Sequence, residues 1–173
     1  EAGHAVCALF TPTSPAIERI SIRGDLAGSL GFVSYADPAH RYVVTRGQLL
    51  DQICTLLGGR EAEALLLDDV SIGSAADLER ATAIARALVE EFGLGGNEIG
   101  LRVIDRERSA SAAVSENLKV ALEHAVRRIL DEQQARAQGL VSAHRALVEA
   151  LRAALLEKQV LDREALSRVL PTL

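Results

Sequence analysis

The chain has 173 residues, of which 49% are hydrophobic and 3% aromatic, a composition that favours one domain of helices packed through aliphatic side chains. Its net charge is −5 and no basic run is longer than Arg127-Arg128, which argues against nucleic acid or an anionic membrane surface as a partner. Cys7 and Cys54 fall in two separate apolar helical patterns, which predicts buried thiols in a reducing compartment rather than a disulfide. No stretch resembles a signal peptide or a membrane span, so we expect a cytoplasmic protein whose membrane contact would need an upstream anchor.

The first forty residues predict a short helix and a small β element. The pattern of "EAGHAVCALF" has helical spacing and stops before Pro12, so a helix should end near Phe10. The segments "AIERISIRG" and "SLGFVSYADP" are rich in β-branched and aromatic residues, which predicts a β-hairpin or two strands of a small sheet. The opening motif "EAGH" therefore lies on a helix.

The next fifty residues predict a run of helices. Thr45 begins a capping box before an apolar stripe, which predicts a helix that breaks at Gly58-Gly59 and then resumes. Ser74 and Asp77 repeat the capping-box spacing, so another helix should begin there and stop at Gly93. This second capping box would put Asp77 in the first turn of its helix.

A Gly-rich segment separates these helices from the C-terminal third. Residues 94–111 have little periodicity and predict a mobile loop. Residues 112–173 contain two long Ala- and Leu-rich patterns and a short helix that Asp162 could cap, which predicts a helical hairpin followed by a short helix. We therefore expect a mainly α fold with a small β-sheet, in which residues 1–93 form the core.

Glu1 and His4 lie three positions apart, so they share one helix face. The same Glu-x-x-His spacing forms the last four positions of the zinc-protease pattern His-Glu-x-x-His. In that pattern two imidazoles bind zinc, and the glutamate takes a proton from the water that attacks a peptide carbonyl. The first histidine would stand immediately before Glu1 and is absent from the sequence. By itself the pair is more typical of a surface helix contact.

A zinc hydrolase needs a third protein ligand. Cys7 and Phe10 occupy the positions where the extended metalloprotease pattern has Gly and His, so a carboxylate must serve. The sequence leaves several candidates open, and they are Glu61, Glu63, Asp68, Asp69 and Asp77.

The order of several motifs resembles the peptidase domain of the FtsH family of ATP-dependent zinc proteases. The matching motifs are "EAGHAV", "LGFVSY", Thr45-Arg46 at a helix start, "LGGREAE" at residues 57–63, "GSAADLERAT" at residues 73–82, and the final "LVEALRAALLEKQVLDREAL". The chain departs from the family's usual residues at Ala64, Ser74 and Ala76 and along residues 94–111. These departures indicate a divergent member.

The resemblance implies a role for each site residue. Glu1 would be the catalytic base, and zinc would be bound by a histidine ahead of residue 1, by His4 and by Asp77. Glu63 would orient an imidazole through its free ring N–H. An extended substrate would add as a strand along the segment Ser29, Leu30, Gly31, Phe32, Val33 and Ser34.

The resemblance also implies partners outside the chain. An upstream AAA ATPase module would bind ATP and magnesium and feed unfolded polypeptides to a homo-hexamer. An upstream segment could hold the protein at the cytoplasmic face of the inner membrane. The alternative is a proteolytically inactive helical platform that oligomerises the ATPase, and the residue encoded before Glu1 separates the two hypotheses.

Overall fold

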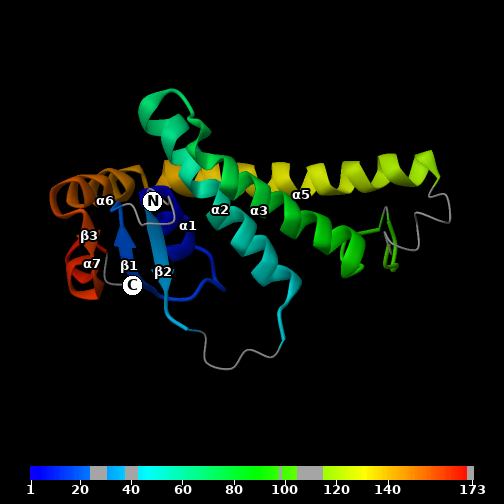
Figure 1. The fold of residues 1–173 in the computed structure, drawn as a ribbon, viewed down its shortest axis with the longest axis horizontal. Coiled ribbons are helices and arrows are strands. Elements are labelled where there is room, and N and C mark those ends of the chain that lie inside the picture. The colour runs from blue at the N-terminus through cyan, green and yellow to red at the C-terminus, as the bar shows by residue number, and fades with distance from the viewer. Residues whose placement is uncertain (24–30, 38–42, 98, 105–114, 171–173) are drawn as a thin grey trace.

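The computed structural model describes residues 1–23, 31–37, 43–97, 99–104 and 115–170, and it confirms a mainly helical fold with a small sheet. The elements in chain order are α1 (Ala2–Leu9), β1 (Ile17–Ser21), β2 (Phe32–Tyr35), α2 (Arg46–Leu67), η1 (Ile72–Ser74), α3 (Ala75–Arg86), η2 (Ala87–Glu91), α5 (Glu116–Ala143), α6 (Arg145–Lys158), β3 (Val160–Leu161) and α7 (Arg163–Val169). Helix α5 runs along the long axis with α2 and α3 beside it, and the sheet, α6, α7 and the N-terminus gather at one end (Figure 1).

The predicted hairpin strands pair antiparallel, with Ile20 opposite Val33 and Ser21 opposite Phe32. Strand β3, which was not predicted, pairs with the other side of β1, so the sheet order is β2-β1-β3. Strand β2 is therefore an edge strand. Of the expected segment at residues 29–34, Phe32, Val33 and Ser34 lie in β2 and Gly31 precedes it, while Ser29 and Leu30 lie outside the described residues.

The predicted break at Gly58-Gly59 is wrong, because α2 runs without interruption from Arg46 to Leu67. A Cβ at Gly58 would lie 2.7 Å from the Cys7 Sγ and from the Gly3 carbonyl oxygen of α1. The glycines thus let α1 approach the α2 backbone closely, and this packing outweighs the roughly 1 kcal/mol that a helical glycine costs. The predicted start of α2 is confirmed, since both bonds of the Thr45 capping box form.

The capping box predicted for α3 does not form. The Ser74 hydroxyl donates to the Ser71 carbonyl oxygen and makes no cap bond, while Asp77 lies in the first turn as expected. The helix continues through the π-helical turn η2, and Gly93, at φ +64°, ends it as predicted. Beyond it, the Leu94 N–H donates to the Leu88 carbonyl and the Ile104 N–H to the Glu90 carbonyl. These bonds hold the described part of residues 94–111 against η2. Residue 98 and residues 105–111 lie outside the described chain, and the mobility of the segment stays a prediction.

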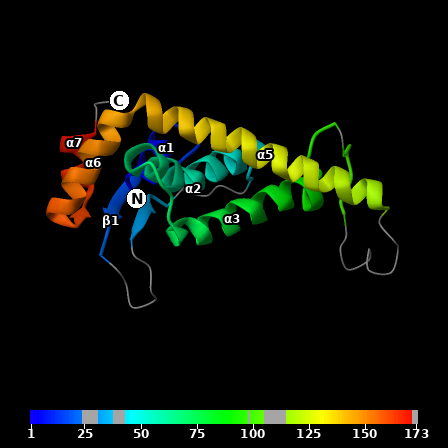
Figure 2. The same ribbon diagram turned by 90° about the horizontal axis from the view of Figure 1, so that it is seen from above.

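The C-terminal third contains the expected helices with one difference. Only His144 separates α5 from α6, and α6 turns away at an angle instead of folding back along α5 (Figure 2). The His144 ring stacks on Phe10 with their centroids 3.5 Å apart, which ties this bend to the end of α1. Helix α7 is capped by Asp162, as predicted.

The core is aliphatic, as the composition indicated. Cys7 and Cys54 are both free and fully buried, which confirms the prediction of two thiols. Among the described helices, none is both long and apolar enough to cross a membrane.

Candidate metal centre

Glu1 stands directly before α1 and presents its carboxylate to the start of β2. The backbone oxygen of Glu1 accepts the first helical bond, from the Ala5 N–H at 3.0 Å, but its side chain makes no cap bond. A Cβ at Gly31 would lie 2.7 Å from the Glu1 Oε1 atom, so the glycine leaves space for this carboxylate. Glu1 therefore faces the edge of the sheet with its carboxylate free of the helix end.

His4 lies one helical turn further along α1, and the surrounding backbone fixes its ring. The Nδ1 atom is 2.8 Å from the carbonyl oxygen of Thr55 on α2, which can only accept, so Nδ1 carries the proton and donates it. This bond leaves Nε2 as the free ligand atom. The face of α2 next to the ring carries Gly59, where a Cβ would lie 2.7 Å from the imidazole Cε1 and 3.1 Å from Cδ2.

Asp77 meets this ring from the first turn of α3, where Oδ2 lies 3.3 Å from His4 Nε2. Both side chains are largely shielded, at 16% and 27% exposure. Burial acts to raise the pKa of Asp77, but the hydrogen bond and charge of His4, with the charge of Arg80, outweigh it and hold that pKa below its ordinary value. The fold thus brings two residues 73 positions apart onto one point.

The chemistry of this pair fits a metal ion. With Nδ1 held by the Thr55 carbonyl, Nε2 is the ring atom that faces the carboxylate oxygen of Asp77, so both atoms are placed where they can bind one cation. Two ligands of a tetrahedral zinc, at about 2.0–2.1 Å from the metal, lie about 3.3 Å apart, which matches the observed 3.3 Å. Within the described residues no cluster of three or more His, Cys, Asp or Glu side chains that could hold a metal ion forms.

The other carboxylates considered for the third ligand have different partners or positions. Glu61 is buried and accepts from Gln134 Nε2 at 3.0 Å, and Asp69 accepts from the Val70 N–H. Asp68 is the exposed residue that ends α2 in a left-handed conformation. Glu63 accepts from the backbone N–H and the hydroxyl of Ser71, at 2.8 and 2.9 Å.

The described bonds of Glu63 run to Ser71, and its role in orienting an imidazole stays a prediction. For His4, the ring N–H is oriented by the Thr55 carbonyl, and both carboxylate oxygens of Glu63 are engaged with Ser71. Glu63 thus joins α2 to the segment that leads into α3. That link helps to hold Asp77 opposite His4.

Glu1, His4 and Asp77 line one end of a cavity of about 370 Å³. The rest of its wall comes from α1, Ile22, α2, Ser71, η1 and α6, and the α6 residues Val148, Arg152, Leu155 and Leu156 were missed by the sequence reasoning. The available signal was their spacing, which places them on one face of a helix. What brings that face to the site is the bend at His144.

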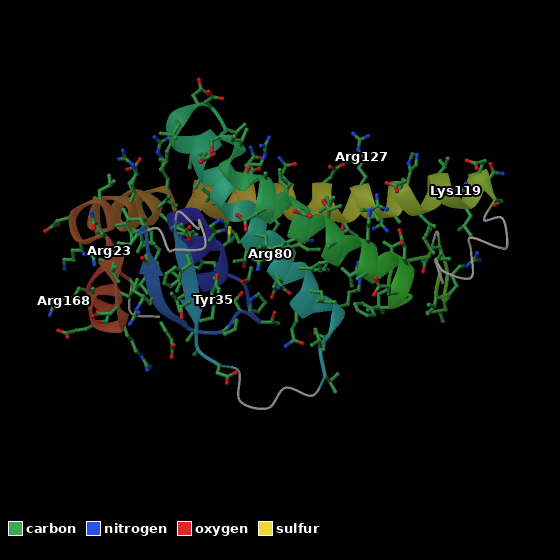
Figure 3. The ribbon with its side chains drawn as sticks, viewed as in Figure 1. Arg23, Tyr35, Arg80, Lys119, Arg127 and Arg168 are labelled. Atoms are coloured by element: carbon green, nitrogen blue, oxygen red, sulfur yellow. The ribbon has the colours of Figure 1, made fainter. Side chains whose placement is uncertain are left out.

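Tyr35, the last residue of strand β2, was also missed (Figure 3). Burial, followed by the charges of Glu1, Cys7 and Asp77, raises the pKa of Tyr35 to about 12. Its phenol therefore stays neutral at ordinary pH and lies within electrostatic reach of the site. No spacing in the sequence indicates this proximity.

Comparison with known proteins gives consistent matches. A profile of peptidase family M41 matches residues 1–169. The chain is 34% identical to the ATP-dependent zinc metalloprotease FtsH of Pseudothermotoga lettingae over 99% of its length, and 34% identical to that of Ralstonia pickettii over 98%. It is 33% identical over 98% of its length to the ATP-dependent zinc metalloprotease YME1L of Drosophila melanogaster. The chain spans 29%, 25% and 23% of these three relatives.

Proposed function

The chain belongs to peptidase family M41, and we propose that it is the zinc-dependent endopeptidase domain of an ATP-dependent protease that degrades unfolded proteins. The observation that carries this proposal is the His4–Asp77 pair, whose ligand atoms are spaced as two ligands of one zinc ion. The third ligand would be a histidine encoded directly before Glu1, which would complete His-Glu-x-x-His.

The chemistry that zinc supplies in such a site is polarisation of the peptide carbonyl and a lower pKa for water. Glu1 takes the proton from the attacking water and then passes it to the leaving amine. The position of Glu1 supports this role, because its carboxylate is unused by the helix end and lies in the same cavity as His4 and Asp77. The Thr55 carbonyl keeps the His4 ring in the tautomer that leaves Nε2 free.

Substrate would bind as an extended strand along residues 29–34, the segment that continues into β2. The edge position of β2 supports this proposal, since an edge strand offers unpaired backbone groups to a further strand. Glu1 lies against Gly31 at the start of this edge. A peptide paired there would pass beside the proposed base.

The size of the relatives supports a larger protein around this domain. We propose that an upstream AAA ATPase module binds ATP and magnesium and delivers polypeptide, and that the assembly is a homo-hexamer. A cytoplasmic location, free or at the inner membrane through an upstream anchor, belongs to the same proposal. The relatives are named ATP-dependent zinc metalloproteases, which supports the ATP and zinc requirements.

The test is a Glu1→Gln substitution in the full-length protein. It should abolish cleavage of an unfolded substrate such as casein while about one zinc per chain is retained, because glutamine keeps the shape of the side chain but cannot accept the proton. Glu18→Gln, a change on β1 outside this cavity, is the matched control and should leave cleavage intact. If Glu1→Gln cleaves the substrate at the wild-type rate, the mechanism is contradicted. If the wild-type protein neither binds zinc nor cleaves, the alternative of an inactive helical platform is correct.

A further inference from the structure

The cavity continues away from Glu1, His4 and Asp77, into the space between the end of α2 and helix α6. Apolar side chains form most of this far part, and they are Ile22, Leu66, Leu67, Val148, Leu155 and Leu156. These side chains have no part in holding the metal pair. The far part therefore offers room for a substrate side chain next to the bond that is cut.

Two arginines also line this space, Arg60 on α2 and Arg152 on α6. Neither has an ion pair or a side-chain hydrogen bond within the described part of the chain, whereas Arg145 on the same helix as Arg152 pairs with Glu149 at 2.9 Å. Glu63, an acid that also lines the cavity, has both carboxylate oxygens engaged with Ser71. Among the described residues, these two guanidinium groups therefore line a largely apolar space without an ion-pair partner.

We propose that Arg152, together with Arg60, binds the carboxylate of an acidic substrate side chain, so that the protease favours cleavage next to glutamate or aspartate. This inference rests on the proposed function. The aliphatic wall suits the methylene stem of such a side chain, and a guanidinium fork matches a carboxylate in shape and charge. A lysine at the same place meets two like charges.

The size of the preference follows from the exposure of the pair. Arg152 is exposed, so its contact with a carboxylate is worth no more than about 1 kcal/mol, which corresponds to about a fivefold preference. Salt weakens such a contact. The preference should therefore shrink as ionic strength rises, while cleavage of a leucine-containing peptide should not follow it.

The experiment uses the full-length protein with zinc and ATP and one peptide sequence in which a residue flanking the cut bond is Glu, Gln, Leu or Lys. The wild-type protein should cleave the Glu peptide with a kcat/KM about fivefold above that of the Gln peptide. Arg152→Gln should bring this ratio close to one and leave the Leu peptide unaffected, and Arg152→Glu should favour the Lys peptide. Arg145→Gln is the matched control, because it removes a charge from the same helix outside the cavity, and it should keep the wild-type ratio.

The outcomes separate the two proposals. If all peptides are cleaved without a preference for Glu, the inference is overturned and the proposed function stands. The same holds if Arg152→Gln keeps the wild-type ratio of kcat/KM between the Glu and Gln peptides. If wild-type protein cleaves none of the peptides, the proposed function fails and the inference fails with it. If Arg152→Gln loses all cleavage, Arg152→Lys decides: it should keep part of the preference for Glu, and cleavage without that preference overturns the inference.

Discussion

Replacing Gly59 with alanine should displace the His4 imidazole and weaken zinc binding. The new Cβ would lie 2.7 Å from the ring Cε1 and 3.1 Å from Cδ2, which is closer than the 3.5–4.0 Å or so at which carbon atoms pack. Because the α2 backbone cannot yield easily, the ring must move. It then loses its 2.8 Å bond to Thr55 and its alignment with Asp77. Zinc affinity should fall by about 10- to 100-fold, the range typical of losing a contact that orients a ligand.

The matched control is Gly139→Ala, the same substitution in helix α5, where a Cβ meets nothing within 4 Å. This change should leave zinc affinity unaltered and stabilise the protein by up to about 1 kcal/mol. Zinc affinity is measured by chelator competition in the full-length protein, with helical content checked by circular dichroism. A wild-type affinity in Gly59→Ala refutes the reasoning, and an equal loss in both variants shows that the effect is not local to His4.

Two further predictions concern stability. Because the pKa of Tyr35 is raised from 10.0 to about 12, its phenol ionises at lower pH in the unfolded chain than in the folded one. The free energy of unfolding should therefore fall by up to about 3 kcal/mol between about pH 10 and 12. Urea unfolding should show that Tyr35→Phe lacks this loss, and the same fall of stability with pH in both proteins would contradict the prediction. Thr45→Ala removes the hydroxyl that accepts the Gln48 N–H and should cost about 1 kcal/mol of unfolding free energy. Thr45→Ser keeps the hydroxyl and should retain most of the wild-type stability. An unchanged free energy of unfolding in Thr45→Ala would show that the cap does not stabilise the protein.

The elements that the sequence predicted correctly depend on local chemistry. The capping box of Thr45, the cap at Asp162 and the left-handed stop at Gly93 each act within a few residues, so their positions could be inferred from spacing. The glycines at 58 and 59 misled the prediction because their role is tertiary. They make room for Gly3, Cys7 and the His4 ring, none of which their neighbours in sequence reveal.

The candidate site was predictable only in part for the same reason. The Glu1 and His4 spacing points to a helix face, but nothing local separates Asp77 from the other carboxylates; its approach to His4 follows from how α3 packs on α2. The capping box expected at Ser74 does not form, and the Asp77 side chain contacts His4. The α6 wall of the cavity depends on the bend at His144. Strand β3 is only two residues long and exists through its pairing with β1.

The central claim is that His4 and Asp77 bind one zinc together with a histidine encoded before Glu1. The most direct test is the zinc content of the full-length protein after dialysis, measured for the wild type, for Asp77→Ala and for Asp69→Ala as an exposed acidic control. We expect about one zinc per chain in the wild type and in Asp69→Ala, and almost none in Asp77→Ala. Full zinc content in Asp77→Ala, or none in the wild type, would contradict it.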